Sequence, residues 1–410
     1  MNRCKYSPPN HLQFRFLELR SGSLKDPLGG TLLHRILSPE NNKIPDFEAL
    51  SYAWGDQSNP DSICITDERR AAKDELVESQ PTGRIDVGPN LASALCTLRK
   101  CNDKRLVWCD SICINQSDVV ERSEQVQRMS DIYRYAKRVV VWLGPEAPWT
   151  GLFMETVRRV ASETISIELC PATHGLRHKI MYTTTGENLP LSTKYGDPLP
   201  LSPSQWLAVE KLLALDWHRR LWTYQEIMFA NQETTIIQLG NEEMLWKRFK
   251  DAVTVICIFR PPPPTAFLDP INHNINIQAF VEKAIPSEER YEYHNWLPPL
   301  GLTACYLCSD GRDKVFSLRN LMVPDVARLV TVDYTKSAKE IFTSFCINHL
   351  AYQQGIQFMH FCNSDTNPSW AADPAGTEMY SMNIICYASR QPAASVYRIE
   401  PSVLDVAGVT

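Results

Sequence analysis

Apolar and polar residues alternate near the start of the chain in the pattern of half-buried strands. Residues 13–20 (QFRFLELR) interleave aromatic and aliphatic residues with charges, which indicates a strand with one face in a core. A turn marked by Gly and Pro follows at residues 26–30, and residues 32–37 are again apolar. Residues 48–54 form the next predicted strand, which Gly55 and Asp56 end.

Between residues 90 and 143, segments with apolar residues at helical spacing alternate with apolar runs typical of strands. Residues 90–100 predict a short helix, and residues 105–109 predict a buried strand. A longer helix begins at Asp118, with Glu121 three positions later as in a capping box. Its apolar stripe consists of Val126, Met129, Tyr133 and Ala136. Residues 139–143 predict a strand buried on both faces, so that strand, helix and strand recur as in a parallel α/β sheet.

Later segments suggest a second region. Residues 67–84 indicate an exposed loop insertion and residues 165–204 a long variable insertion, because both lack periodicity. An amphipathic helix at 206–215 and a strand at 234–239 complete the first unit. Four prolines at 261–264 mark a boundary, after which residues 336–352 read as helical and residues from 396 onward as short strands. We therefore expect an α/β domain over 13–240 and a mainly helical accessory region with short strands over 251–410.

Composition limits the range of partners. A chain of 410 residues predicts two or three units at about 150 residues per domain. The net charge of -5 and pI of about 6.0 give no reason to expect nucleic acid or an anionic membrane as partner. No apolar run reaches the roughly 18 residues that suggest a membrane span, and no secretory apolar region opens the sequence.

The 13 cysteines are odd in number and irregularly spaced, which favours reduced thiols and a cytoplasmic location. The sequence has one CxxC, Cys305 to Cys308, without a second pair at zinc spacing, so buried thiols on a helix are the favoured interpretation and no metal is predicted. Cys109 and Cys113 are expected to be buried packing residues.

The first of three segments with candidate chemistry is ALSYAWGD at 49–56, at the predicted end of a strand. One interpretation is the lip of a pocket: Gly55 lets the backbone approach a ligand, Tyr52 or Trp54 stacks on a flat ring, and Ser51 donates a hydrogen bond. The alternative is a strand end with packed aromatic residues and a turn.

The second and third segments are WCDSICINQ at 108–116 and RLWTYQE at 220–226. Asp110 either binds a ribose hydroxyl or caps its own loop. Trp222 and Glu226 are four residues apart on a predicted helix and share a face, unlike Arg220 and Glu226. A carboxylate beside an indole is partly desolvated, which suits proton transfer or stabilisation of a developing cation. The alternative is an amphipathic helix with a solvated Glu226.

Jointly and in this order, the segments resemble the heterokaryon incompatibility (HET) domain of filamentous fungi. The family pattern reads ALSYxWG, then WxDxxCINQ followed by ER and WLG, then RxWxxQE, and residues 47–230 carry it. Weaker similarity continues at Arg312–Phe316 (RDKVF), at Asp333-Tyr334 and at Pro368–Trp370, although Pro374 follows Asp373 where the family has Trp. The last residues, LDVAGVT, look like a strand cut at its end, as in a truncated chain.

HET domains are in turn remotely similar to Toll/interleukin-receptor (TIR) domains. This resemblance implies a flavodoxin-like, mostly parallel sheet with helices on both faces. It also implies non-self recognition that triggers programmed cell death, with hydrolysis of NAD at the nicotinamide–ribose bond as a candidate activity. Glu226 would be the catalytic residue, and the substrate-binding residues would be Ser51, Tyr52, Trp54, Gly55, Asp110, Arg220 and Trp222. No metal or cofactor is implied, and NAD would be a substrate.

The alternative is a non-enzymatic signalling module that self-associates into a homo-oligomer or binds another incompatibility protein. Both interpretations expect the three segments to meet at one cleft, because carboxyl ends of parallel strands share an edge. Residues 251–410 are expected to support the core rather than to carry chemistry. Within them, Asp313 is expected to be a structural ion-pair partner, because Arg312 and Lys314 flank it.

Overall fold

The computed structural model describes residues 3–10, 13–23, 25–41, 43–67, 83–170, 177–182, 199–258, 279–280, 283, 296–353, 395–400 and 403–407. These residues belong to two compact units that interleave along the chain. The first unit comprises Met1–Gln116, Asp131–His218 and Glu226–Ile285. The second comprises Ser117–Ser130, Arg219–Gln225 and Pro286–Thr410. Each unit is described by itself.

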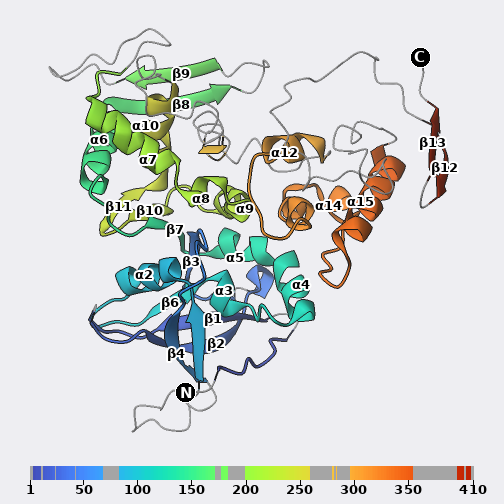
Figure 1. The fold of residues 1–410 in the computed structure, drawn as a ribbon, viewed down its shortest axis with the longest axis horizontal. Coiled ribbons are helices and arrows are strands. Elements are labelled where there is room, and N and C mark those ends of the chain that lie inside the picture. Colours follow the sequence, from blue (N-terminus) through green and yellow to red (C-terminus); the bar gives the residue numbers. More distant parts are fainter. Residues whose placement is uncertain are drawn as a thin grey trace. The chain divides into compact units, whose positions relative to one another are not determined.

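Four parallel strands form the centre of the first unit (Figure 1). In spatial order they are β6 (Arg105–Trp108), β3 (Glu48–Tyr52), β7 (Arg138–Gly144) and β10 (Ile236–Leu239). The β-branched run of β7 is buried along nearly its whole length, as strands covered on both faces require. The prediction that residues 48–54 and 139–143 share one parallel sheet is therefore confirmed, since β3 pairs directly with β7.

Antiparallel pairs flank this centre, so that the whole sheet is mixed. On the β6 side lie β1 (Gln13–Leu19), β2 (Gly29–Ile36), β4 (Asp61–Asp67) and β5 (Gly83–Val87). On the β10 side lies β11 (Glu242–Leu245), which a two-residue turn joins to β10. Gly240 in that turn has a φ of 58°, a left-handed conformation that favours glycine. The sequence pattern missed β4 and β5 and did not foresee the antiparallel flanks.

The described helices of the first unit are α2 (Pro89–Leu98), α3 (Asp110–Cys113), α5 (Met129–Tyr135), α6 (Thr150–Glu163), α7 (Pro203–Leu213), α8 (Asp216–Arg219) and α10 (Trp246–Ile258), with a 3-10 turn, η1, at Pro39–Asn41. Of these, α2 and α7 correspond to the helices predicted at 90–100 and 206–215, whereas the sequence pattern does not predict α3, α6, α8 or α10. Ser202 and Gln205 form a capping box at the start of α7. Helices α5, α8 and α9 (Trp222–Phe229) each contribute residues to both units.

The helix predicted to run from residue 118 to 138 is in fact two helices. The first, α4 (Val119–Gln127), has the predicted cap, because the Asp118 side chain accepts hydrogen bonds from the amides of Val120 and Glu121. It ends at Arg128, whose φ of -109° and ψ of 4° are not helical, and α5 follows. The predicted apolar stripe is nevertheless buried as expected.

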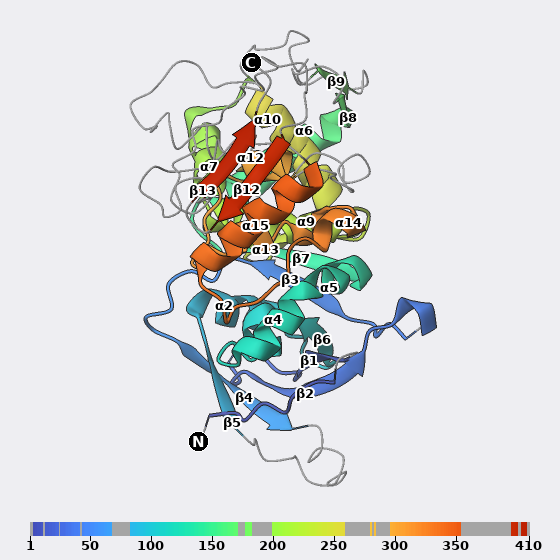
Figure 2. The same ribbon diagram turned by 90° about the vertical axis from the view of Figure 1, so that its right-hand side faces the viewer.

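The second unit is mainly helical. It contains α12 (Leu297–Leu302), α13 (Asp313–Phe316), the 3-10 turn η3 (Arg319–Leu321), α14 (Pro324–Ala327) and α15 (Ala338–Gln353). The antiparallel hairpin of β12 (Ser395–Glu400) and β13 (Val403–Ala407) is also assigned to it, and Figure 2 shows the two strands side by side. The described part of the chain from residue 296 onward thus has the expected helices and short terminal strands, whereas α10 and the segment up to Ile285, predicted as part of the same region from residue 251, belong to the first unit.

One further prediction about a loop is wrong, and several predicted segments lie outside the described residues. The segment 165–204 is not structureless, because β8 (Thr164–Cys170) and β9 (Arg177–Tyr182) pair as an antiparallel hairpin within it. The four prolines at 261–264, the segment 368–374 and most of the loop 67–84 lie outside the described residues. Among the helices that the structure describes, none has the length and apolar character needed to cross a membrane.

A partly buried ion-pair triad joins the amino ends of the three neighbouring strands β6, β3 and β7. The Glu48 carboxylate accepts hydrogen bonds from Arg105 through one oxygen and from Arg138 through the other. Burial acts to raise the pKa of Glu48, but the hydrogen bonds and charges of the two guanidinium groups outweigh it and lower that pKa. The triad therefore joins the three strands at one edge, with two guanidinium groups sharing one carboxylate.

This triad predicts acid-dependent stability. Because the pKa of Glu48 is lower in the folded chain than its ordinary value of 4.5, its contribution is present above pH 4.5 and is lost as the pH falls below it. We expect Glu48→Gln to lower the free energy of unfolding at pH 7 by about 1–3 kcal/mol and to flatten its acid dependence. Urea denaturation between pH 3 and pH 7 measures both, and an unchanged acid limb in the variant would contradict the assignment.

Candidate functional site

The carboxyl ends of β3 and β6 bring the first two sequence segments together. Tyr52 Oη donates to Asp110 Oδ1 at 2.9 Å, and Trp54 Nε1 donates to Asp110 Oδ2 at 2.9 Å. Asp110 is 8% exposed and Tyr52 2% exposed, so the hydrogen bond between them is shielded from water, whereas the one from Trp54 is partly buried. The amide of Gln116 braces the same loop by donating to the Asp110 carbonyl at 2.9 Å. Asp110 therefore binds side chains of its own chain rather than only capping its loop.

Asn90, which the sequence did not single out, connects the ends of β3 and β7. Its Nδ2 donates to the Ala53 carbonyl at 2.6 Å, and its Oδ1 accepts from Trp142 Nε1 at 2.8 Å. Gly55 follows with a φ of 63°, and a Cβ built on it would lie 3.8 Å from the Asn90 side chain. Gly55 is thus required mainly by the backbone turn, and the start of α2 lies beside the carboxyl ends of two adjacent strands.

Ser51 differs from its predicted role at a pocket lip. It is fully buried, and its hydroxyl accepts a hydrogen bond from Trp217 Nε1 at 2.9 Å. Trp217 lies on α8, 166 residues further along the chain, and belongs to an aromatic cluster with Trp246. Lys283 Nζ lies 4.4 Å from the Trp217 ring centre and caps α8 through the carbonyls of Trp217 and His218. Ser51 therefore anchors this cluster to β3.

Cys109 and Cys113 flank Asp110 and are fully buried, as predicted. A hydrogen bond with the Cys113 thiol, together with burial, raises the pKa of Cys109 well above its ordinary value. Such a thiol stays protonated and is a poor nucleophile at neutral pH. The two cysteines are consequently packing residues of the Asp110 loop.

Residues of the third segment lie on or next to α9. Arg220 precedes the helix and forms an isolated β-bridge with Leu307 in the second unit. Glu226 is 1% exposed, so the alternative of a solvated glutamate on an amphipathic helix is wrong. Arg220 and Trp222 belong to the second unit and Glu226 to the first. That all three segments meet in one cleft stays a prediction.

A second Tyr–Asp–Trp arrangement lies within the second unit. Asp313 Oδ2 accepts from Trp222 Nε1 at 2.9 Å, and its Oδ1 accepts from Tyr334 Oη at 2.5 Å. The expectation that Asp313 is a local ion-pair partner is wrong, because its flanking cations bind elsewhere. Arg312 donates two hydrogen bonds to the Asp310 carboxylate, at 2.7 and 2.8 Å. Lys314 donates to the carbonyls of residues 303, 304 and 306.

The surroundings of Asp313 determine its charge. Burial raises its pKa to about 6, and the hydrogen bonds from Tyr334 and Trp222 offset only part of that effect. Two guanidinium groups lie over the Tyr334 ring: Arg122 at 3.8 Å from its centre and Arg312 at 5.1 Å. Asp313 is thus a buried carboxyl group that changes its protonation state close to physiological pH.

The CxxC pair is not on a helix, contrary to expectation. Cys305 lies in a turn, and Cys308 follows the isolated bridge of Leu307; both are partly exposed. Burial raises the pKa of Cys308 to about 11, which disfavours the thiolate that a metal would need. In the described part of the chain, no group of three or more His, Cys, Asp or Glu side chains is arranged to hold a metal ion.

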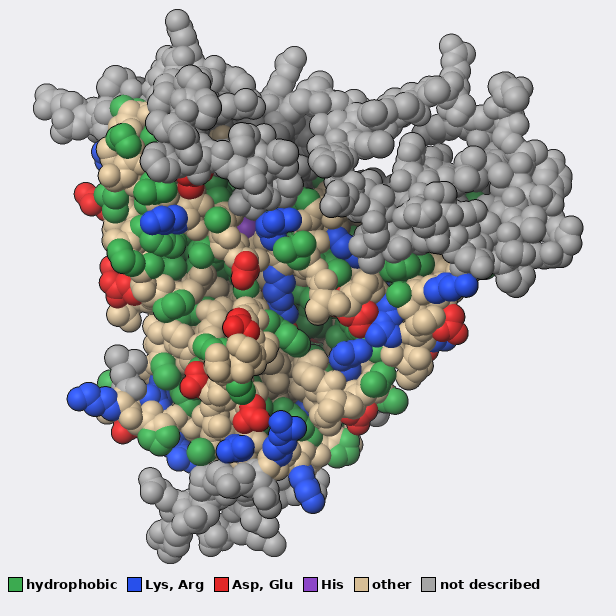
Figure 3. Space-filling view, in the orientation of Figure 1, with side chains coloured by type: hydrophobic (Ala, Val, Ile, Leu, Met, Phe, Trp, Pro, Cys, Tyr) green, Lys and Arg blue, Asp and Glu red, His purple; other side chains and the backbone are tan. Residues whose placement is uncertain are grey.

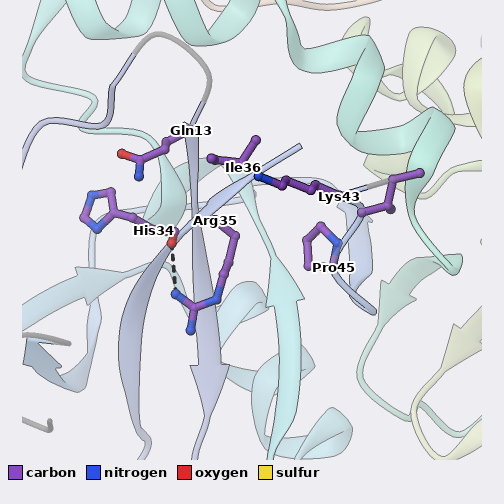
Figure 4. A pocket seen from close by; sticks show the side chains of 7 residues that line it. Gln13, His34, Arg35, Ile36, Lys43 and Pro45 are labelled. Atoms are coloured by element: carbon purple, nitrogen blue, oxygen red, sulfur yellow. Dashed lines mark hydrogen bonds between the residues drawn. The ribbon is translucent and has the colours of Figure 1, made fainter. Parts of the chain in front are cut away.

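A shallow hollow of about 410 Å³ lies over β1 and β2, away from the motif residues in sequence (Figure 4). It is lined by Gln13, His34, Arg35, Ile36, Lys43, Ile44 and Pro45. The Arg35 guanidinium turns back to donate to the His34 carbonyl at 2.9 Å, as the dashed line in Figure 4 shows. On the face drawn in Figure 3, basic and acidic side chains are interspersed, in keeping with the modest net charge.

Comparison with known proteins adds the family context. Residues 47–226 match the family model described as "Heterokaryon incompatibility protein (HET)". The chain is also similar to "Heterokaryon incompatibility protein 6, OR allele" of Neurospora crassa, with 30% identity over 252 residues, which are 53% of this chain and 32% of that protein. The match therefore spans about a third of that relative's length. No solved structure matches the chain.

The Asp110 arrangement predicts a specific stability effect. Asp110→Asn leaves one buried donor, Tyr52 Oη or Trp54 Nε1, opposite an amide N–H, and we expect the free energy of unfolding to fall by about 1–3 kcal/mol. The matched control is Asp56→Asn in the same segment, where the carboxylate is exposed and the change should stay within about 0.5 kcal/mol. Equal effects of the two variants in urea denaturation would contradict a structural role for Asp110.

The raised pKa of Asp313 predicts a pH dependence of the opposite sign to that of Glu48. The folded chain holds this proton up to about pH 6, whereas the unfolded chain loses it near 3.8, so stability decreases as the pH rises between these values. Over this range the loss due to Asp313 should be roughly 3 kcal/mol, and Asp313→Asn should remove it. Chemical denaturation at pH 4, 5, 6 and 7 measures the slope, and the same slope in both proteins would refute the prediction.

Proposed function

Because the chain is a heterokaryon incompatibility (HET) domain protein, we propose that it acts in fungal non-self recognition and triggers programmed cell death when incompatible cells fuse. The observation that carries this proposal is the use of the family's segments. Tyr52, Trp54 and Asp110 bind one another in the first unit, and Trp222 is bound in the second. The residues that carry the resemblance to the family are therefore the same residues that form these hydrogen bonds.

The order of the central strands supports a flavodoxin-like, and hence TIR-like, architecture as part of the proposal. Taken in chain order, β3, β6, β7 and β10 lie in the spatial order second, first, third, fourth. This is the order of the first four strands in flavodoxin-like sheets, where ligands bind outside the carboxyl ends of the strands at the switch point. Here the switch point lies between β3 and β7, whose carboxyl ends Asn90 connects through Ala53 and Trp142.

The activity that we propose is hydrolysis of NAD, with Glu226 as the catalytic residue. The bond between the nicotinamide nitrogen and ribose C1′ breaks, and its electron pair neutralises the nicotinamide ring. The Glu226 carboxylate stabilises the resulting oxocarbenium-like ribose, more strongly in a dry site than in water. Water then adds to C1′ and loses a proton, which gives ADP-ribose, nicotinamide and one proton. Support comes from the burial of Glu226, which is 1% exposed.

A specific observation favours a second candidate function, a non-enzymatic signalling module. Ser51, Tyr52 and Trp54 all form hydrogen bonds with side chains of the protein itself. In this function the segments stabilise the fold, and the signal passes through a homo-oligomer or through another incompatibility protein. For both candidates we propose a cytoplasmic location, supported by the odd number and irregular spacing of the 13 cysteines.

Nicotinamide release from NAD by the purified protein separates the two candidates. We expect wild-type protein to release nicotinamide and Glu226→Gln to lower the rate by at least about a hundredfold, because the variant cannot stabilise a cation by charge. Killing of the fungal host on expression should fall in parallel. The matched control is Glu48→Gln, the same substitution at the amino ends of the strands, which should keep both activities at a temperature where the variant is folded.

Two results would change this conclusion. Full killing by Glu226→Gln with normal NAD levels would exclude the enzymatic mechanism and favour the signalling module. Loss of killing in both variants with equal loss of folded protein, measured by circular dichroism, would assign Glu226 a structural role only.

A further inference from the structure

The network around Trp222 reaches beyond the part of the chain that matches the family model. Trp222 lies within residues 47–226, whereas Asp313 and Tyr334 lie outside that range. Asp313 is 6% exposed and Tyr334 7% exposed, while Trp222 is partly exposed. Trp222 is therefore a partly exposed residue whose indole N–H is bound by a buried carboxyl group.

We propose that Asp313 and Tyr334 are positioning residues that fix the Trp222 indole in the orientation in which it stacks on a flat ring of the ligand. This inference rests on the proposed function, with Trp222 among the substrate-binding residues that the family resemblance implies. Asp313 acts through its hydrogen bond to Trp222 Nε1, and Tyr334 acts through Asp313. All three residues belong to the second unit.

Tyr334 is itself held in place by hydrogen bonds to its backbone amide and carbonyl groups. Its amide donates to Ser123 Oγ on α4 at 3.0 Å. Its carbonyl accepts from the Arg312 guanidinium at 2.9 Å, and Asp310 binds that guanidinium through two nitrogens. With Arg122 stacked 3.8 Å from the ring centre, the Tyr334 hydroxyl has little freedom to move away from Asp313.

Positioning by a carboxylate requires that it is charged. Anionic Asp313 accepts from both donors, but protonated Asp313 carries a donor of its own and must give up or reverse one of the two bonds. The charged and titratable groups that face it are Asp310, Arg122, Arg312, Tyr334 and Cys308. Because the pKa of Asp313 is about 6, its carboxyl group should be charged at pH 7 and neutral in acid, where its hydrogen bond from the indole N–H is weaker.

The orientation of the indole can be measured without any ligand. We would incorporate 5-fluorotryptophan into the full chain, record ¹⁹F NMR spectra, and assign the Trp222 resonance by its absence in Trp222→Phe. Asp313→Asn and Tyr334→Phe should each shift and broaden this resonance, and in wild type it should titrate with a midpoint near pH 6. Tyr334→Phe keeps the stacked ring and removes only the hydroxyl, so it tests the network even if Asp313→Asn folds poorly.

Asp110→Asn is the matched control, because Asp110 also accepts from one Tyr hydroxyl and one Trp N–H. It should move the Trp54 resonance and leave that of Trp222 in place. A Trp222 resonance that is unchanged in both Asp313→Asn and Tyr334→Phe would overturn the positioning role, whatever the protein's activity.

The functional consequence is tested by a double-mutant cycle. With wild-type Trp222, Asp313→Asn should raise KM for NAD about tenfold and leave kcat little changed, because a misplaced indole weakens binding. In the Trp222→Phe background the same substitution should have little further effect. Equal effects of Asp313→Asn in both backgrounds would show that it does not act through Trp222. If wild type releases no nicotinamide, the proposed function fails, and the NMR result alone decides the positioning role.

Discussion

Two buried aspartates, each accepting hydrogen bonds from one tyrosine hydroxyl and one tryptophan N–H, constrain both units of this protein. Asp110 binds Tyr52 and Trp54 in the first unit, and Asp313 binds Trp222 and Tyr334 in the second. A buried carboxylate without donors costs far more than a hydrogen bond returns, so all three members of each set must be present together. This requirement couples residues that lie far apart in the sequence within each unit.

The centre of the sheet could be predicted from sequence because its signals are local. The β-branched run of β7 and the Asp118 cap of α4 are each visible within a few residues. The flanks could not be predicted in the same way, since the direction of pairing depends on distant partners such as β1 and β6. The hairpin of β8 and β9 was missed for a related reason: its strands lie in a segment whose composition resembles a loop.

The candidate site also contains some contacts that local sequence signals predict and others that depend on distant partners. The meeting of Tyr52, Trp54 and Asp110 could be expected, because carboxyl ends of neighbouring parallel strands share an edge. The role of Asp313 was missed because the neighbouring Arg312 and Lys314 suggested local pairing, whereas its partners lie 91 and 21 residues away. The bond from Trp217 to Ser51 spans 166 residues and leaves no pattern that one sequence could reveal.

The choice of donor separates structural carboxylates from those that respond to their surroundings. Glu48 is paired with two guanidinium groups, which lower its pKa below its ordinary value and so favour its charged form. Asp313 receives only neutral donors, so burial dominates and its pKa rises to about 6. An arginine in place of Tyr334 would lower the pKa of Asp313 and favour its charged form, as the two arginines do for Glu48. With tyrosine at position 334, the strength of the hydrogen bond from Trp222 depends on whether Asp313 is protonated. Nearby charges that shift the pKa of Asp313 therefore also change this hydrogen bond.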